Sequence, residues 1–228
     1  MASLRSALVA GATGLTGRAL CHQLVADKRY RRVCALVRHP SDALPGCEQL
    51  VCNLRAIPTL EAVDDAFCCL GTTSKIAGSP EKFREVDFDF VVNVARAAKV
   101  AGAKRLLVLS ALGANGNSKM LYSRVKGEME DALAALDFEA LHIFRPSFLI
   151  GGTLQRTESR PVERLSIAAF TAISPLLIGA AKKYRPIRVS TVARAMIGAA
   201  FDGESGISVY ESNEIERLAA LAEAPARN

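Results

Sequence analysis

The sequence has no long run of charged residues and no apolar stretch long enough to cross a membrane. Its longest uncharged stretch, 165–181, is shorter than the roughly 20 residues that a membrane-spanning helix needs, and Pro175 interrupts it. These absences predict a chain that is ordered nearly throughout and has no integral membrane segment. The 165–181 stretch is a candidate contact surface for a membrane surface, for a second copy in a homodimer or for a protein partner.

Cysteine and histidine do not occur at the spacing of metal ligands. The six cysteines form no Cys-x-x-Cys pair and have no histidine at ligand spacing. His22, His39 and His142 each stand alone, so we expect core or surface histidines and no metal ion. The apolar segment 6–17 is too short and too rich in glycine for a secretion signal. We therefore expect mostly buried, reduced cysteines and a cytoplasmic location.

Basic residues outnumber acidic ones, and the formal net charge is +6. Twenty of the 29 basic residues are arginines, whose guanidinium group can bind phosphate through two hydrogen bonds. This favours an anionic ligand, although a protein that is merely basic would have the same composition. The basic residues are scattered and do not alternate with aromatic residues, so we expect no nucleic-acid partner.

Short apolar runs bounded by turn residues predict buried strands at 7–10, 33–37, 49–52, 66–70, 106–109 and 140–144. Apolar residues that return every three or four positions predict helices over 16–26, 80–101, 119–136 and 214–223. This alternation is typical of the α/β class with a doubly wound parallel sheet, the Rossmann fold. We expect one domain over residues 1–228, with 151–190 as a small carboxyl-terminal segment on the substrate side.

A glycine-rich loop follows the first predicted strand and opens directly into a helix. Its sequence is Gly11-Ala12-Thr13-Gly14-Leu15-Thr16-Gly17. Glycines at these spacings permit a tight turn, close approach of a pyrophosphate and close packing of helix on strand, while the first N–H groups of the helix attract the anion. The loop predicts dinucleotide binding, with Arg18 as a further contact just past the last glycine.

Arg38, after the second predicted strand, indicates which dinucleotide is bound. A protein that prefers NAD usually has an acidic residue about 20 residues beyond the glycine loop. Here Val37 is followed by Arg38, whose guanidinium can bind the ribose 2′-phosphate of NADP. NADP(H) is therefore preferred, and NAD(H) stays open as an alternative because Asp42 lies close by.

Tyr122 and Lys126 are four residues apart in a predicted helix, so their side chains share one face. A phenol with a pKa near 10 exchanges its proton more easily when a neighbouring ammonium stabilises the phenolate. Ser110 stands just past a predicted strand, where its hydroxyl can bind the same substrate oxygen. The three residues predict a catalytic site that also contacts the cofactor. A surface i,i+4 pair for Tyr122 and Lys126, and a helix or turn cap for Ser110, are the structural alternatives.

These motifs resemble the atypical or extended short-chain dehydrogenase/reductases. The order of the glycine loop, Arg38, Ser110 and Tyr122-x-x-x-Lys126 carries this resemblance. The stretches Tyr122-Ser-Arg-Val-Lys126-Gly-Glu-Met-Glu130, Phe144-Arg-Pro146 and Glu158-Ser-Arg-Pro161 are similar to the Tat-interactive-protein oxidoreductases and their bacterial relatives. Two departures are Cys68-Cys69-Leu70-Gly71, where ordinary members have Asn-Ala-Gly, and a region after 150 that is short for a substrate domain.

The resemblance implies an NADP(H)-binding Rossmann domain with roles for particular residues. Tyr122 would be the acid/base, Lys126 would also bind the nicotinamide ribose, and Ser110 would orient a carbonyl. By the same resemblance, Gly71 and Thr72 would line the adenosine side, and Pro146 and Ser147 would border the nicotinamide. Asn93 matches an asparagine that is common in the family.

The sequence thus predicts an NADPH-dependent oxidoreductase that reduces a small carbonyl compound by hydride transfer. One alternative is a non-catalytic module that senses NADP(H) and contacts another protein. A third reading, an epimerase or dehydratase, uses the same fold but is less supported by the short carboxyl-terminal half.

Overall fold

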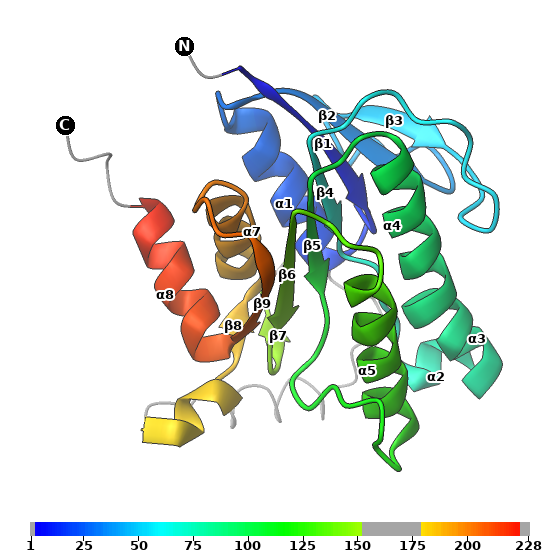
Figure 1. The fold of residues 1–228 in the computed structure, drawn as a ribbon, viewed down its shortest axis with the longest axis vertical. Coiled ribbons are helices and arrows are strands. Elements are labelled where there is room, and N and C mark those ends of the chain that lie inside the picture. Colours follow the sequence, from blue (N-terminus) through cyan, green and yellow to red (C-terminus); the bar gives the residue numbers. More distant parts are fainter. Residues whose placement is uncertain (1–2, 152–178, 224–228) are drawn as a thin grey trace.

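The computed structural model describes residues 3–151 and 179–223, and a seven-stranded sheet forms its centre (Figure 1). The strand order is β3-β2-β1-β4-β5-β6-β9, and every neighbouring pair is parallel. This doubly wound order confirms the predicted Rossmann fold. The strands are β1 (Arg5–Ala10), β2 (Tyr30–Val37), β3 (Glu48–Val51), β4 (Asp65–Cys68), β5 (Arg105–Leu109), β6 (Ala140–Arg145) and β9 (Gly206–Glu211).

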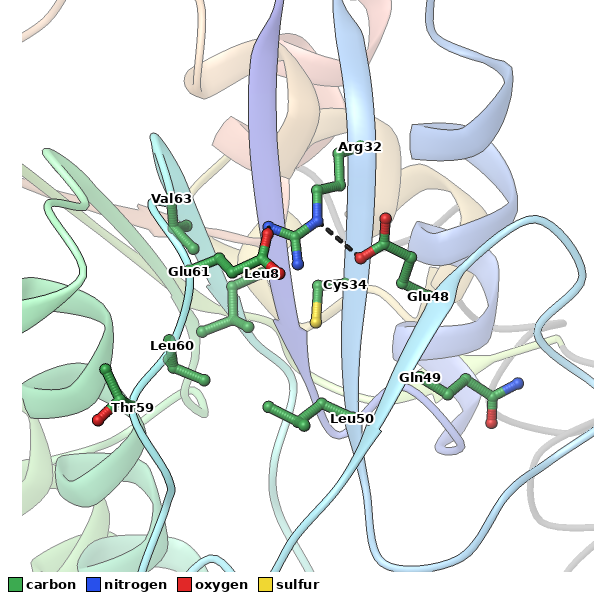
Figure 2. Close-up of a pocket in the computed structure, with 10 residues that line it drawn as sticks. All are labelled: Leu8, Arg32, Cys34, Glu48, Gln49, Leu50, Thr59, Leu60, Glu61 and Val63. Atoms are coloured by element: carbon green, nitrogen blue, oxygen red, sulfur yellow. Dashed lines mark hydrogen bonds and ion pairs between the residues drawn. The ribbon is translucent and has the colours of Figure 1, made fainter.

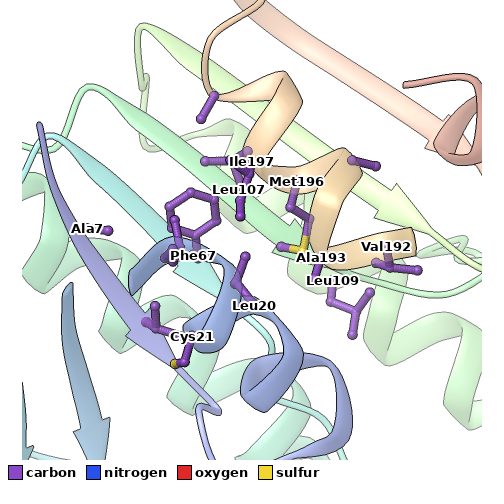
Figure 3. Close-up of a cluster of buried hydrophobic side chains, with 14 of the residues drawn as sticks. Ala7, Leu20, Cys21, Phe67, Leu107, Leu109, Val192, Ala193, Met196 and Ile197 are labelled. Carbon is purple, nitrogen blue, oxygen red and sulfur yellow. The ribbon is translucent and has the colours of Figure 1, made fainter. Parts of the chain in front are cut away.

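Helices cover both faces of the sheet. On one face lie α1 (Leu15–Ala26), α7 (Val189–Ala199) and α8 (Ser212–Glu223), and on the other lie α4 (Phe90–Val100) and α5 (Leu121–Ala134) (Figure 1). Figure 3 shows the hydrophobic core on the face covered by α1, α7 and α8, where Leu20 of α1 and Met196 of α7 pack on Phe67 and Leu107 of the sheet. Because successive strand residues point to opposite faces, buried strands of this kind are apolar along their whole length.

The segment predicted as one helix over 80–101 is divided into three parts. α3 (Pro80–Arg84) begins after Ser79, whose side chain accepts a hydrogen bond from the Lys82 N–H at 3.2 Å. A π-helical turn, η1 (Glu85–Asp89), then leads into α4. An extra residue in a π turn displaces the helix locally, and here the turn contains the fully buried Asp87. A short helix, α2 (Ser74–Ala77), precedes α3.

The carboxyl-terminal part adds elements that the sequence patterns did not predict. β7 (Leu149–Ile150) and β8 (Ile187–Arg188) pair with each other, and a 3₁₀ helix, η3 (Gly179–Tyr184), precedes β8. α7 and β9 follow, and β9 extends the main sheet beyond β6. The expected substrate-side segment 151–190 and contact surface 165–181 fall mostly outside the described residues. Within the described part of the chain, no helix is long and apolar enough to span a bilayer.

Candidate functional site

Most residues predicted for the site follow the carboxyl ends of five strands of one parallel sheet, whereas Tyr122 and Lys126 lie on α5. The glycine loop follows β1, Arg38 follows β2, Gly71 and Thr72 follow β4, Ser110 follows β5, and Pro146 and Ser147 follow β6. Since the carboxyl ends of parallel strands lie along one edge, this is the edge where doubly wound sheets bind ligands. The structure therefore brings these segments to a common edge of the sheet.

The glycine loop packs so tightly that two of its glycines cannot be replaced without movement. A Cβ atom at Gly11, whose φ is +74°, would lie 2.5 Å from the carbonyl carbon of Cys69. A Cβ atom at Gly17 would lie 2.1 Å from the carbonyl oxygen of Gly11. Gly11 thus lets the loop turn against the end of β4, and Gly17 lets α1 start directly on the loop.

The start of α1 fits the pyrophosphate of a dinucleotide. Gly14 is the N-cap residue, no side chain caps this helix, and its first turn contains no acidic residue. The first N–H groups of such a helix have no partner within the helix and carry its positive dipole end. Thr13, Gly14 and Leu15 are exposed, whereas Thr16 and Gly17 are buried. The exposed half of the loop is therefore open to an anion.

Arg38 and Arg18 stand beside this loop with their guanidinium groups available. Arg38 is exposed and Arg18 is half-buried. Among the described residues, neither side chain has a hydrogen-bond or ion-pair partner. Asp42, the acid that kept the NAD(H) alternative open, is also exposed. A free guanidinium can bind an anionic ligand without first losing an internal carboxylate.

Lys126 is buried one helical turn after Tyr122 and is paired with a carboxylate. Its Nζ lies 2.8 Å from Oδ1 of Asp87, and both side chains are almost completely buried. The other carboxylate oxygen of Asp87, Oδ2, accepts a hydrogen bond from the backbone N–H of Thr72 at 2.8 Å. Asp87 therefore connects the loop after β4 to the predicted catalytic lysine.

Tyr122 packs its ring against Phe83, with the ring centroids 5.5 Å apart. Tyr122 is 37% exposed, and the partial burial of its phenol raises the pKa of Tyr122; the Lys126 ammonium lowers this pKa in part, and the Asp87 carboxylate raises it further. The ammonium therefore acts in the expected direction, but the net pKa of the phenol lies above its ordinary value. The reason is that burial and the Asp87 charge together outweigh Lys126. At neutral pH the phenol of the free protein carries its proton.

Ser110 donates its hydroxyl hydrogen bond into the protein. The acceptor is Oε1 of Glu130, which is buried on α5 one turn after Lys126. Arg145 binds both oxygens of the same carboxylate, with its Nε donating to Oε1 at 3.0 Å. The Ser110 hydroxyl and the Arg145 guanidinium therefore bind the same Glu130 side chain in this structure.

The remaining predicted residues take different positions. Gly71 stands next to the Lys126–Asp87 pair, because a Cβ atom there would lie 3.4 Å from Asp87 Oδ1. Pro146 accepts a hydrogen bond from the Leu112 N–H through its carbonyl oxygen at 3.0 Å. Ser147 uses both its N–H and its hydroxyl within the fold, donating to Ser212 Oγ and to the Arg185 carbonyl oxygen. The side chain of Asn93 donates a hydrogen bond to the Leu54 carbonyl oxygen at 3.1 Å.

Comparisons with known sequences decide the family. The sequence model of a family described as NAD(P)H-binding matches residues 11–170, which include the glycine loop and the Tyr122–Lys126 pair. Protein HTATIP2 of Rattus norvegicus is 32% identical over 230 residues, which cover 97% of this chain and 92% of that protein. The chain belongs to the NAD(P)H-binding family.

Fungal relatives of this NAD(P)H-binding chain carry a location in their names. Protein FMP52-1, mitochondrial, of Scheffersomyces stipitis is 30% identical over 228 residues, covering 93% of this chain and 98% of that protein. Protein FMP52, mitochondrial, of Eremothecium gossypii is 37% identical over 150 residues, covering 64% of this chain and 67% of that protein. The predicted cytoplasmic location is therefore wrong by this comparison, because sequence features alone did not reveal relatives named as mitochondrial.

Solved structures agree with the Rossmann fold of the NAD(P)H-binding family. A UDP-glucose 4-epimerase from Thermotoga maritima superposes with a TM-score of 0.68 at 16% identity, covering 96% of this chain and 81% of the epimerase. A short-chain dehydrogenase/reductase superfamily protein from Agrobacterium tumefaciens, solved with bound NAD, gives 0.66 at 16% identity, covering 96% and 84%. At this identity the likeness concerns the fold, which is the predicted one.

Sequence reasoning missed two acidic residues at the edge of this NAD(P)H-binding fold, Asp87 and Glu130. Both occur on the buried stripe of a helical segment, where apolar residues are expected. Asp87 follows the buried Phe83 by four positions and precedes the buried Val91 by four, and Glu130 follows Met129. A charge on such a stripe is retained only with a buried partner, so this placement was a usable signal.

A separate cavity of about 220 Å³ lies over β1, β2 and β3 (Figure 2). It forms where the chain passes from β3 to β4 through a loop instead of a helix. At its wall, Arg32 pairs with Glu48 at 2.7 Å and with Glu61 at 2.8 Å. None of the residues predicted for the cofactor or for catalysis lines this cavity.

Proposed function

We propose that this chain is an NADP(H)-dependent oxidoreductase that reduces a small carbonyl compound, with Tyr122 as the acid/base. A continuous path of contacts from the glycine loop to Tyr122 supports this proposal. Gly11 lies against Cys69, the chain continues to Thr72, and Thr72 binds Asp87, which pairs with Lys126. The cofactor loop and the Tyr122–Lys126 turn of α5 are thus parts of one packed unit.

The cofactor preference follows from the charges beside the glycine loop. The pyrophosphate would be held by the N–H groups at the start of α1, where Leu15 and Thr16 offer backbone donors, while the Gly14 N–H is bound to the Gly11 carbonyl oxygen at 3.0 Å. The 2′-phosphate would be held by Arg38, with Arg18 as a second cation. Because these guanidinium groups have no partners among the described residues, they add affinity for NADPH that NADH does not receive.

The chemistry requires a proton donor beside the reacting carbonyl. A nicotinamide held at this site would supply the hydride for the carbonyl carbon. The Tyr122 hydroxyl gives its proton to the carbonyl oxygen, and the Lys126 ammonium stabilises the phenolate that remains. The raised pKa of Tyr122 keeps the phenol protonated at neutral pH, which suits the direction of reduction. Ser110, held in place by Glu130, orients the carbonyl once its hydroxyl turns from that carboxylate.

We assign the remaining residues to the two ends of the cofactor. Gly71 and Thr72 line the adenosine side, and Pro146 and Ser147 border the nicotinamide. Residues 151–190 serve the substrate side of a single NAD(P)-binding domain over residues 1–228. The class of substrate is a small aldehyde, ketone or quinone.

A second candidate function is NADP(H) sensing without turnover. The internal partners of Lys126 and Ser110 favour it, because Asp87 and Glu130 satisfy these groups without a substrate. In this function the cofactor would order the loop after β4 for a protein partner. Turnover with a carbonyl compound distinguishes the two functions.

The cofactor assignment is tested by titrating the protein with NADPH and NADH and following the cofactor fluorescence. We expect NADPH to bind more tightly, and Arg38→Ala to weaken NADPH about tenfold while leaving NADH nearly unchanged. Arg31→Ala is the matched control, since Arg31 is an exposed arginine near the start of β2, the strand that Arg38 follows, and lies outside the predicted cofactor site. Equal affinities for the two cofactors, or a preference that survives Arg38→Ala, would contradict the assignment.

A further inference from the structure

Asp87 is a fully buried carboxylate whose two partners come from different parts of the site. Its Oδ1 lies 2.8 Å from the Lys126 ammonium, and its Oδ2 accepts the Thr72 N–H at 2.8 Å. Burying a charge costs free energy that only well-placed partners offset. The buried Asp87 charge lies where the loop after β4 contacts α5, the helix that carries Tyr122.

The backbone around Asp87 is shaped to place this carboxylate. It lies in the middle of the π-helical turn η1, between two regular helices. π turns insert one residue into a helix and often occur at functional sites. Gly71 has no side chain where a Cβ atom would lie 3.4 Å from Asp87 Oδ1 and 3.6 Å from Lys126 Nζ. The exposed Gly71 thus stands directly beside the buried ion pair.

We propose that Asp87 is a positioning residue that fixes the Lys126 ammonium relative to both the cofactor loop and Tyr122. The inference rests on the function proposed above and deepens it. An unpaired lysine side chain samples many rotamers, whereas one ion pair to a backbone-anchored carboxylate selects a single direction. Because Thr72 and Lys126 share this carboxylate, ordering of the loop after β4 by a cofactor is transmitted to the ammonium.

The Asp87 charge also controls how easily Tyr122 loses its proton. Among the described residues, the charged or titratable groups that act on the phenol and the ammonium are Asp87 from η1, the Cys68 thiol at the end of β4, and Tyr122 and Lys126 themselves. Asp87 raises the pKa of Tyr122 and Lys126 lowers it. Asp87→Asn keeps an acceptor for Thr72 but removes the negative charge. The phenol of this variant will therefore ionise at lower pH.

The test measures the phenol and the cofactor without any substrate. The ultraviolet absorbance of the phenolate is followed against pH in the wild type, in Asp87→Asn and in Asp89→Asn. The titration of each protein is repeated in a variant that also carries Tyr122→Phe, so that the difference between the two absorbance curves gives the Tyr122 signal. Asp89 is the matched control, because it lies in the same π turn but is exposed. NADPH affinity is measured on the same proteins.

We expect Asp87→Asn to move the Tyr122 titration to lower pH and to weaken NADPH binding about tenfold, while Asp89→Asn changes neither. An unmoved titration together with wild-type NADPH affinity in Asp87→Asn would overturn the role of Asp87. If Asp87→Asn does not fold, Asp87→Glu is measured instead. Its carboxylate is displaced by one methylene group, so we expect its NADPH affinity to fall about tenfold as well. Wild-type NADPH affinity in Asp87→Glu would overturn the role of Asp87. Failure of the wild type to bind NADPH would instead end the proposed function.

Discussion

The Ser110 hydroxyl donates its hydrogen bond to Glu130, a buried carboxylate that is also bound by Arg145. These three residues come from the end of β5, from α5 and from the end of β6. The network therefore joins two neighbouring strands of the sheet to the helix that carries Tyr122 and Lys126. The position of Ser110 is set by Glu130, which the proposed reaction does not otherwise use.

Replacing Glu130 tests whether this network stabilises the fold. Glu130→Gln keeps an acceptor for Ser110 but removes the charge that binds the largely buried Arg145 guanidinium. We expect a loss of about 2 kcal/mol in the free energy of unfolding, measured by urea denaturation. Glu128→Gln is the control, because the Arg84–Glu128 pair is much more exposed, and its loss should be below about 0.5 kcal/mol. Equal losses in the two variants would show that the buried network adds no stability.

The strands and the glycine loop could be predicted from the sequence for simple physical reasons. A parallel strand buried on both faces is a short continuous apolar run, as in Leu106–Leu109, and turn residues limit it. The glycine loop was recognisable because both φ at Gly11 and the space at Gly17 require glycine. Such local requirements restrict the residue type at individual positions, so they can be recognised in a single sequence.

Other parts of the fold depend on contacts between distant residues. The π turn at Asp87 forms where Thr72 and Lys126 bind the carboxylate, and the local sequence pattern predicts a regular helix there. β9 was missed because its apolar residues Ile207 and Val209 are exposed and alternate with polar ones at the sheet edge. The net pKa direction of Tyr122 also required the structure, since spacing gives the lysine but not the burial.

His142 predicts how stability responds to acid. It is buried in β6, its Nδ1 lies 3.0 Å from the Tyr210 hydroxyl, and burial lowers its pKa below the ordinary value of 6.5. The unfolded chain then binds a proton more readily than the folded protein does. The contribution of His142 to the free energy of unfolding is complete above its pKa in the unfolded chain. This contribution is lost as the pH falls through 6.5 toward the lower pKa of His142 in the folded protein.

The measurement is urea unfolding of the wild type and of His142→Phe between roughly pH 7.5 and about pH 5. The wild type should lose more stability over this interval than His142→Phe, which has no titrating group there. His39 is exposed, so His39→Gln should lose as much as the wild type. A slope in His142→Phe as steep as in the wild type would show that other groups cause the acid response.

In the proposed function, Tyr122 faces the reactive ring of a bound nicotinamide and gives its proton to the substrate. The most direct measurement is the rate of NADPH oxidation with a panel of aldehydes, ketones and quinones, for the wild type, Tyr122→Phe and the control Tyr184→Phe. Phenylalanine keeps the ring that packs on Phe83, and Tyr184 is exposed on η3. We expect the wild type to turn over at least one carbonyl class. In Tyr122→Phe the rate of NADPH oxidation should be at least about 100-fold lower, with unchanged NADPH affinity, and Tyr184→Phe should have the wild-type rate. Indistinguishable rates for the wild type and Tyr122→Phe would contradict it.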